Sequence, residues 1–400
     1  MADDGSGLLA SAEVGALLAA AVEHGGGKLL AWSLDHVDAH PRRSTTATYQ
    51  ATVEWPFGSR EELVGVSARA AGLTEVDTRA EVFADGEREV AVWLYPNDPD
   101  LPGLPRAAYE SQIAEVLAAA GVTASGDGVH TLDMLTYRPR RRAVVKVTTP
   151  QGSVIYVKVL RPRTLAGIRD RHEILRRAGI PAPEVAATTN DGLLLLHALP
   201  GIPLAQAIFS EPVPCTAEEI VAVLDAMPKA VTRLERRPPW AASVEHYAGI
   251  VAAALPAEED RLADLTSQIL LGLSRFPPGE EATHGDFHEG QVHVAGQRIV
   301  GVLDIDTIGP GRRADDLACL IAHLSTIQRM RPDQAARVHD LLQRWVPVFD
   351  LRVDPVELRL RTAAVIISLA TGPYRGQEPD WERETVAMLD AAAALVRQVS

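Results

Sequence analysis

The chain has 400 residues, of which 46% are hydrophobic and 23% are charged. This composition is that of a globular protein and excludes a disordered or fibrous chain, and the length favours more than one domain. The formal net charge of −14 argues against a general binder of nucleic acids or anionic membranes, because such proteins need Lys and Arg to neutralise phosphates.

The cysteine content and the apolar runs bear on the compartment. The 2 cysteines are too few for a disulfide framework or a four-cysteine zinc site, which favours a reducing interior. The first residues are acidic where a secretion signal would be basic, and no apolar run reaches the roughly 18 residues that span a bilayer. We therefore predict a cytoplasmic protein with neither a nucleic-acid nor a membrane partner, and the sequence leaves its oligomeric state open.

Residues 1–125 predict an α+β module without a motif of its own. Residues 8–23 are rich in Ala and Leu at helical spacing and precede three glycines, which predicts a first helix. The strands of the module are expected at residues 45–54, 63–66, 81–83 and 90–95. Residues 106–120 resume a helical pattern, and residues 123–128 predict a linker.

Residues 131–199 predict a small antiparallel sheet with one inserted helix. Its first part, residues 131–163, is basic, with eight Lys or Arg side chains against one acidic residue. Its elements are a hairpin, a helix and two further strands, at residues 142–149, 153–160, 165–178, 185–188 and 193–197.

Residues 200–400 predict a mostly helical domain. Its helices are expected at residues 217–235, 243–254, 258–273, 314–330, 332–345, 355–370 and 379–399. Residues 281–306 are the exception, because short apolar runs at 291–294 and 299–303 alternate there with turn residues. The fold class predicted for the whole chain is α+β.

The loop of residues 283–292 carries the most unusual polar residues. Asp286 lies between glycines, and the carboxamide of Gln291 follows five residues later. In phosphoryl transfer, an Asp accepts or orients the proton of the attacking hydroxyl, and a residue at this spacing supplies an oxygen to Mg²⁺. Asp304 follows an apolar run and supplies a second carboxylate, and oxygen ligands together with phosphates suit Mg²⁺.

The residues 284–291 and 302–306 resemble the catalytic and metal-binding segments of the aminoglycoside phosphotransferase-like kinases. These kinases are the small-molecule branch of the protein-kinase-like fold. The resemblance covers about residues 131–400 and implies two lobes, with residues 131–199 as a sheet-containing N-lobe and residues 200–400 as a helical C-lobe. Residues 1–125 resemble the extra N-terminal portions of some such kinases.

This resemblance implies a role for each matching residue. Asp286 would be the catalytic residue, and Gln291 and Asp304 would be the ligands of Mg²⁺. Lys158 would hold the phosphates of ATP, and Glu173 would orient this lysine by an ion pair. The cofactors implied are therefore ATP and Mg²⁺.

Two further segments match the nucleotide-binding region of this family in position. Residues 193–199 resemble the segment that joins the two lobes, which places His197 and Leu199 beside the nucleotide. The basic turn of residues 137–142 stands where the family has a glycine-rich phosphate loop. Arg140 could therefore meet phosphates by its side chain instead of through backbone amides. The alternative is that this turn carries solvated surface charge.

Competing residues exist for the nucleotide site. A lysine on a strand is commonly an exposed edge residue, and Lys146 on the preceding strand is a rival for Lys158. Asp170 and Glu184 compete with Glu173, whose alternative is a solvated position on a helix.

The histidines and the remaining acidic residues of the loop region also allow two interpretations. His284, His288 and His293 suggest a metalloprotein, since imidazole binds zinc, but we favour a role for His284 in holding the loop through backbone hydrogen bonds. Asp306 is either close to the metal site or part of a turn. Asp316 is expected to cap a helix or to brace the loop.

The same resemblance implies that the acceptor of the phosphoryl group is a small molecule with a hydroxyl group. The acidic chain and the likeness to resistance kinases favour an aminoglycoside or a related aminosugar. Gln291 instead favours a sugar kinase of the maltokinase or glucosamine kinase type, because the larger family usually has Asn there and maltokinase-like kinases resemble this chain in having Gln. Trp240, Trp345 and Trp381 could line a sugar pocket, although tryptophans in helices are more often core. A catalytically silent nucleotide-binding protein is the third possibility.

Overall fold

The computed structural model describes residues 5–40, 44–70, 79–84, 88–210, 213–330 and 334–399. The chain forms two compact units. The first unit comprises Met1–Ala166, Val185–Ala198 and Tyr374–Pro379, and the second comprises Gly167–Glu184, Leu199–Pro373 and Asp380–Ser400. Each unit is described by itself. The predicted helix over residues 332–345 begins outside the described residues.

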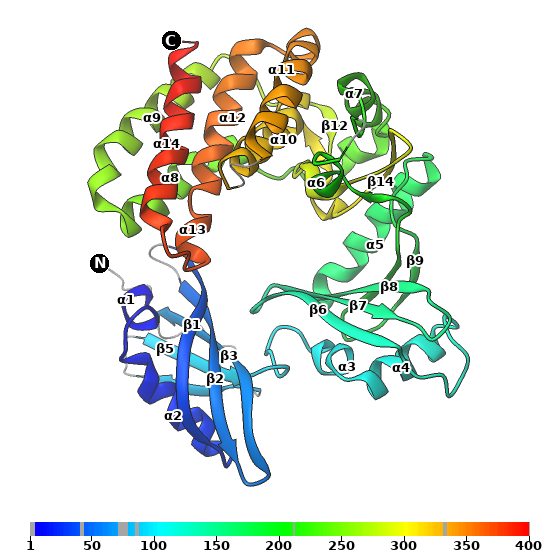
Figure 1. Cartoon of the computed structure of the whole chain (residues 1–400), viewed down its shortest axis with the longest axis vertical. Helices are drawn as coiled ribbons and strands as arrows, with labels where there is room; N and C mark the ends of the chain where they lie inside the picture. Colours follow the sequence, from blue (N-terminus) through cyan, green and yellow to red (C-terminus); the bar gives the residue numbers. More distant parts are fainter. Residues whose placement is uncertain are drawn as a thin grey trace. The chain divides into compact units, whose positions relative to one another are not determined.

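The first unit contains two antiparallel sheets of five strands each (Figure 1). The first sheet has the order β1-β2-β3-β5-β4 and consists of β1 (Lys28–His40), β2 (Ser44–Trp55), β3 (Gly58–Ala70), β4 (Glu81–Ala84) and β5 (Arg88–Leu94). The second sheet has the order β6-β7-β8-β10-β9 and consists of β6 (Thr131–Arg138), β7 (Arg142–Thr148), β8 (Val154–Leu160), β9 (Val185–Thr188) and β10 (Leu193–His197). Together with the helices, these sheets confirm the predicted α+β class.

Short helices cover one face of each sheet. The first sheet packs against α1 (Ser6–Leu9) and α2 (Val14–His24), and the hydroxyl of Tyr49 donates to the carbonyl oxygen of Leu9 at 2.5 Å inside that core. The second sheet packs against α3 (Leu104–Ala108) and α4 (Glu110–Ala119). The apolar core of the second sheet therefore joins residues on both sides of the border that we predict near residue 125.

Strand β8 positions a lysine on the other face of this second sheet. Ile155, Val157 and Val159 are fully buried in the core beneath α3 and α4. Because side chains alternate along a strand, Lys158 lies on the opposite face. Lys158 pairs with Val144 of β7 and Leu194 of β10, so it lies within the sheet and not at its edge.

Two long strands of the first unit do not appear in the sequence-based prediction. Strand β1 shifts register against β2 between Leu29 and Ala31 and again between Leu34 and His36. Strand β6 shifts register against β7 between Met134 and Thr136. A bulge moves the following residues to the other face, so the alternation of apolar and polar residues is interrupted within these strands.

The second unit is largely helical. Its helices are α5 (Pro162–Arg177), which begins in the first unit, α6 (Leu204–Ala207), α7 (Ala217–Asp225), α8 (Val244–Ala254), α9 (Glu259–Leu273), α10 (Arg313–Met330), α11 (Ala335–Arg352), α12 (Pro355–Leu369), α13 (Gly372–Arg375) and α14 (Trp381–Arg397). Single 3-10 turns are η1 (Lys229–Arg233), η2 (Trp240–Ser243), η3 (Pro256–Glu258), η4 (Glu289–Gln291) and η5 (Ile305–Thr307). Short strands are β11 (Ile202–Pro203), β12 (Glu281–Thr283), β13 (Val292–Ala295), β14 (Arg298–Val302) and β15 (Gly309–Gly311).

Two apolar cores hold the second unit together. One includes α7, α10 and α11 together with the loop residue Phe287, and Trp345 is buried in it as the core alternative predicts. The other lies among α8, α9, α12 and α14, which run side by side (Figure 1). The short strands β12 to β15 carry the polar loops at the edge of the first of these cores.

The helix predicted over residues 217–235 is shorter in the structure. Helix α7 ends at Asp225, and the 3-10 turn η1 follows from Lys229. Pro228 separates them, because proline lacks the N–H that a continuing helix requires. None of the helices in the described part of the chain is long and apolar enough to cross a bilayer.

Candidate active site

The loop that carries Asp286 begins where β12 ends. Strand β12 pairs with β15, and this pairing sets Thr283 opposite Gly309. Gly285 has a φ of +84°, and a Cβ atom there would lie 2.8 Å from the carbonyl oxygen of Thr307. Only glycine combines this backbone conformation with such a close approach. The turn therefore places Asp286 at a fixed point beside η5.

A buried carboxylate on α10 braces this loop. The backbone amides of His284 and Gly285 donate to Asp316 at 3.0 and 2.8 Å, and Asp316 is fully buried. The guanidinium of Arg313 donates to the same carboxylate at 2.7 Å and to the carbonyl oxygen of Ala282 at 2.8 Å. These charge-assisted bonds satisfy the buried charges. The bracing role predicted for Asp316 is confirmed.

His284 joins the loop to the strand that precedes Asp304. Its Nδ1 accepts from the backbone amide of Asp286 at 3.3 Å, so the proton lies on Nε2, which donates to the carbonyl oxygen of Leu303 at 2.8 Å. The hydroxyl of Thr307 donates to the carbonyl oxygen of His284 at 2.9 Å. The predicted role of His284 in loop bonding is therefore confirmed.

Asp286 itself is partly buried and has a thiol neighbour. The Sγ atom of Cys319 lies 3.8 Å from Oδ1 of Asp286. Burial, together with the charge of Asp286, raises the pKa of this thiol well above its usual value, so the thiol keeps its proton and can donate to the carboxylate. The other carboxylate oxygen of Asp286 has no hydrogen bond to a described residue.

The structure brings Gln291 and Asp304 to one place. The backbone amide of Leu303 donates to the carbonyl oxygen of Gln291 at 2.7 Å, and Val292 pairs with Val302 in the adjoining strands. Asp304 has φ 46° and ψ 48°, a left-handed conformation that is uncommon outside glycine and is enriched at functional sites.

The side chains of this pair fit a hard cation. The side-chain amide of Gln291 contacts Nε2 of His288 at 2.9 Å. A carboxylate oxygen from Asp304 and an amide oxygen from Gln291 are donors that Mg²⁺ prefers. The longer side chain of Gln, compared with Asn, is held in position by its contact with His288.

A compact group of titratable residues adjoins Asp286. The rings of His288 and His323 stack at 4.1 Å between centroids, and Glu289 lies 3.9 and 3.8 Å from their Nδ1 atoms. Burial and the neighbouring His288 lower the pKa of His323 to about 4, so its ring is neutral near pH 7. Burial also opposes the charge on His288, but the interaction with Glu289 and the other negative charges nearby outweigh burial and raise the pKa of His288.

The histidines of the loop do not form the zinc site that was considered for them. Nε2 of His284 contacts the carbonyl oxygen of Leu303, and Nδ1 of His293 lies 3.1 Å from the carbonyl oxygen of Pro200. Within the described ranges, the group whose ligand atoms approach one another is instead Asp286, His288 and His323, at 4.8 Å or less. Of the three histidines on which the metalloprotein alternative rested, His284 and His293 therefore lie outside this group, and His288 belongs to it.

Sequence reasoning missed Cys319 and His323 on α10. Both residues follow Asp316 at helical spacings of three and seven, so they lie on the same face of α10 as the residue that braces the loop. A helical projection that starts from Asp316 would have placed them beside Asp286.

The residues predicted to bind the nucleotide lie in both units. Lys158 is only 8% exposed, which is rare for a lysine unless its charge is paired. Glu173 is half exposed on α5 and pairs with Arg177 at 2.6 Å. His197 is exposed at the end of β10, and Leu199 packs against Gly301 in β14. The proposed pairing of Lys158 with Glu173 joins the two units and stays a prediction.

The basic turn is held by acidic residues of the N-terminal module. The backbone amide of Arg140 donates to Asp98 at 2.7 Å, and its guanidinium lies 3.5 Å from Asp100 and 5.1 Å from the ring centre of Trp93. The φ of Arg140 is +59°. Contact between Arg140 and phosphates stays a prediction, and the turn that would present it is rigidly supported.

Comparison with solved structures finds similar folds at low sequence identity. A thermostable mutant of aminoglycoside phosphotransferase APH(4)-Ia in its apo form is 15% identical over 68% of this chain and 95% of that chain, with a TM-score of 0.48. A choline/ethanolamine kinase family protein from Mesorhizobium loti is 16% identical over 71% and 94% of the two chains, with a TM-score of 0.49. Macrolide 2'-phosphotransferase MphH from Brachybacterium faecium is 20% identical over 72% and 97%, with a TM-score of 0.43.

The family comparison is more direct. No curated protein matches the sequence of this chain. The sequence pattern of the phosphotransferase enzyme family matches residues 139–351, which is more than half of the chain and includes Lys158, Asp286, Gln291 and Asp304. The resemblance inferred from the loop and metal segments is thereby confirmed, and with it the expectation of a kinase-like enzyme. The chain belongs to the phosphotransferase enzyme family.

Proposed function

We propose that this small-molecule phosphotransferase transfers the γ-phosphoryl group of ATP to a hydroxyl of a sugar-containing acceptor. The observation that carries the proposal is the placement of Asp286, which a buried Arg313–Asp316 pair and a glycine turn hold beside Gln291 and Asp304. Such rigid placement is what phosphoryl transfer requires, because its catalysis consists mainly of positioning and charge stabilisation.

In this proposal Asp286 accepts the proton of the acceptor hydroxyl. The hydroxyl oxygen forms a bond to the γ-phosphorus, the bond from that phosphorus to the β,γ-bridging oxygen breaks, and ADP leaves with the electron pair. The thiol of Cys319 donates to one oxygen of Asp286, which leaves the other oxygen for the acceptor. The carboxylate is thus oriented before the acceptor binds.

The cation and phosphate contacts come from the other predicted residues. Gln291 and Asp304 would hold Mg²⁺, which neutralises charge on the phosphates when it is bound. Lys158 would contact the phosphates from the sheet of the first unit, and Glu173, His197, Leu199 and Arg140 complete the proposed nucleotide site. The spacing of these residues along the chain is the support for their roles.

Two acceptor classes follow from the sequence, an aminoglycoside or aminosugar and a neutral sugar. Gln291 favours the sugar-kinase class, because maltokinase-like kinases resemble this chain in having Gln where the larger family usually has Asn. Location in the cytoplasm, where ATP and Mg²⁺ are available, is part of the same proposal.

The test is Mg²⁺-dependent ADP release from ATP by the full chain, with a panel of aminoglycosides, glucosamine, glucose and maltose as acceptors. We expect release that requires both an acceptor and Mg²⁺, and that Asp304→Asn abolishes because it removes a charged ligand of the cation. An exposed aspartate on α9, Asp264, supplies the matched control Asp264→Asn, which should leave turnover unchanged. ATP binding without release for any acceptor would favour the silent binding protein instead.

A further inference from the structure

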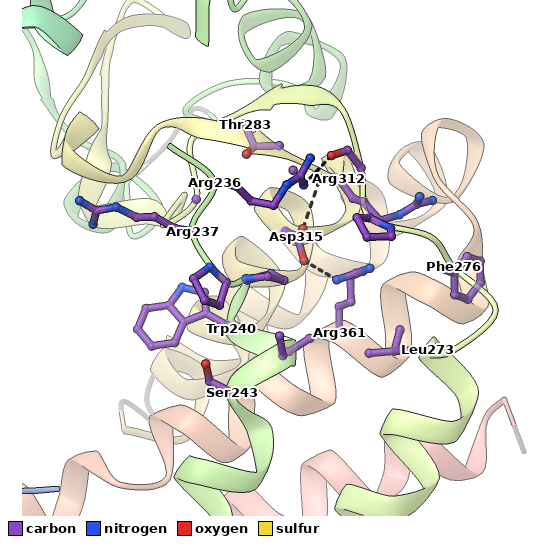
Figure 2. Close-up of a pocket in the computed structure, with 18 of the residues that line it drawn as sticks. Arg236, Arg237, Trp240, Ser243, Leu273, Phe276, Thr283, Arg312, Asp315 and Arg361 are labelled. Atoms are coloured by element: carbon purple, nitrogen blue, oxygen red, sulfur yellow. Dashed lines mark hydrogen bonds and ion pairs between the residues drawn. The ribbon is translucent and has the colours of Figure 1, made fainter. Parts of the chain in front are cut away.

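A cavity of about 690 Å³ opens beside the loop that carries Asp286 (Figure 2). Gly285, which precedes Asp286, and Thr283 form part of its wall. The rest of the wall comes from the segment between η1 and α8 with the first turn of α8, the end of α9 with the residues that follow it, residues 307–315 at the start of α10, and Arg361 of α12. Its volume lies within the range of small-molecule sites, and all of its lining residues belong to the second unit.

The wall of this cavity is rich in arginine. Arg236, Arg237, Arg312 and Arg361 line it, and Asp315 is the acidic residue among the lining side chains. Figure 2 shows Asp315 between Arg312 and Arg361, with a dashed line to Arg361. The cavity therefore has a positive balance of charge in a chain whose overall charge is strongly negative.

The acidic groups near the cavity are already engaged. Asp315 accepts from Arg361 at 2.6 Å, and burial raises the pKa of Asp315 to about 6, which weakens its charge near neutral pH. Glu357 is buried and accepts from Arg312 at 2.8 Å and from Arg361 at 2.7 Å. The wall thus offers no free carboxylate to the ammonium groups of a polycation.

Arg237 differs from the other three arginines. Arg236 is paired with Glu280 at 2.5 Å, and Arg312 and Arg361 are paired as described above. Arg237 is exposed, and no acidic side chain in the described part of the chain pairs with it. A second cation, Arg171, lies near enough to Arg237 for the two charges to repel each other. A free guanidinium in a cavity wall is a binding group for a carboxylate or a phosphate.

Aromatic side chains lie close to Arg237. Two prolines separate it from Trp240, which limits the freedom of the segment between them. Trp240 lies 5.6 Å from Tyr247 between ring centres, and both rings are half-buried in the wall. In Figure 2, Arg237 and Trp240 occupy the same side of the cavity. An apolar ring surface beside one cationic group suits a ring-shaped ligand that carries one anionic substituent.

We propose that this cavity is the acceptor site and that it takes a sugar bearing a carboxylate or phosphate group, which Arg237 binds, in preference to a polycationic aminoglycoside. The proposal rests on the proposed function, because it assigns the acceptor that Asp286 would activate. The sugar ring would lie against Trp240, and the acceptor hydroxyl would point to the loop behind Gly285.

Binding of acceptors to the full chain tests this proposal without a need for turnover. The ligands are glucose 6-phosphate, glucuronate, glucose and the aminoglycoside kanamycin, measured by titration calorimetry at low and high salt. We expect the two anionic sugars to bind more tightly than glucose and kanamycin, and their affinity to fall with salt. Tighter binding of glucose 6-phosphate than of glucuronate would assign the anionic group as phosphate, and the reverse order would assign it as carboxylate.

Variants of Arg237 connect this binding to the cavity. Arg237→Ala should weaken binding of the anionic sugars about tenfold or more and leave glucose binding unchanged, since one charge-assisted interaction is lost. Arg237→Lys should retain part of the affinity because it keeps the charge. The matched control is Arg233→Ala, which removes an exposed arginine of η1 that does not line the cavity. The side chains of Arg237 and Arg233 are both exposed, so these variants do not put the fold at risk.

The outcomes separate this inference from the proposed function. Tighter binding of kanamycin than of the anionic sugars, or unchanged affinity in Arg237→Ala, overturns the inference, and ADP release with kanamycin would then leave the proposed function intact. Arg237-dependent binding of an anionic sugar without any ADP release supports the acceptor class of the cavity and overturns the transfer reaction.

Discussion

Asp98 in the first unit and Asp316 in the second unit hold a turn in different ways. Both are fully buried, and both accept two hydrogen bonds from backbone amides. The donors to Asp316 are the adjacent amides of the loop, whereas Asp98 accepts one bond from Arg140 of the basic turn and one from Asp100 in its own turn. Asp98 receives its third bond from the neutral hydroxyl of Tyr137 at 2.8 Å, whereas Asp316 receives its third bond from the guanidinium of Arg313 at 2.7 Å. An ion pair thus stabilises the loop with the proposed catalytic residue. The basic turn is stabilised by hydrogen bonds from mostly neutral donors.

This difference has a consequence for the ionisation of the two networks. Burial raises the pKa of Asp98, because three hydrogen bonds offset only part of the cost of removing the carboxylate from water. Arg313 is only 2% exposed, and without Asp316 its remaining carboxylate partner would be the more exposed Asp225 at 3.2 Å, so its buried charge would be compensated only in part. We therefore expect the second unit to be more sensitive than the first to loss of its bracing carboxylate.

The largest expected effect is that of Asp316→Ala. The variant leaves the buried Arg313 with only the more exposed Asp225 as a carboxylate partner and frees the amides of His284 and Gly285, so we expect a loss of roughly 3–5 kcal/mol in the free energy of unfolding. Turnover should also fall, because Asp286 loses its support. Urea unfolding and ADP release measure the two effects, with Asp264→Asn as the control, and a loss below about 1 kcal/mol would contradict the account.

A smaller effect is expected for Asp98→Ala in the first unit. The variant leaves the hydroxyl of Tyr137 and the amides of Arg140 and Asp100 without an acceptor, but it leaves no buried cation behind. We expect a loss of about 2 kcal/mol in the free energy of unfolding, measured by the same urea titration. A loss equal to that of Asp316→Ala would show that the ion pair does not distinguish the two networks.

Two glycines with almost the same backbone conformation sharpen the comparison. Gly285 has φ +84° and a close contact with Thr307, whereas Gly152, in the turn between β7 and β8, has φ +83° and open space around it. Gly152→Ala should lower the free energy of unfolding by only the energy of the left-handed conformation, roughly 1–2 kcal/mol. Gly285→Ala should lower the free energy of unfolding by more than Gly152→Ala does. It should also reduce turnover, because the added Cβ displaces the loop. Equal losses of stability and unchanged turnover would argue against a rigid loop.

The smallest effect concerns pH. Burial raises the pKa of Asp315 from 3.8 to about 6, so between these values the folded state keeps a proton that the unfolded state has lost. The contribution of Asp315 to the free energy of unfolding therefore falls as pH rises from about 4 to 6 and is constant above that range. The fall should be absent in Asp315→Asn, as urea titrations at several pH values would reveal, and an unchanged slope would contradict the assignment.

The sequence predicts the polar loops better than the elements around them. One short segment of the chain contains Asp286, Gln291 and Asp304. Their spacing along this segment is a local pattern, and their proximity could be predicted from it. Asp316 was connected to the loop through its place in the same family resemblance. Cys319 and His323 lie more than 30 residues from Asp286, and only the packing of α10 brings them to it.

The acceptor cavity was beyond sequence reasoning for a similar reason. Its wall joins residues from five separated parts of the chain, and Trp240 gave no signal that distinguished a wall from a core. In the first unit, bulges in β1 and β6 disrupted the alternation on which strand prediction depends. Local patterns therefore identify the chemistry of this chain, and tertiary packing determines what surrounds it.

The most direct test of the account is the kcat of Asp286→Asn for acceptor-dependent ADP release, measured beside the affinity of the same variant for ATP. Asn keeps the size of the side chain but cannot accept the hydroxyl proton. The account predicts that kcat falls by about a thousandfold while ATP affinity is retained. A kcat within about tenfold of the unmodified protein would contradict the role of Asp286 as the proton acceptor.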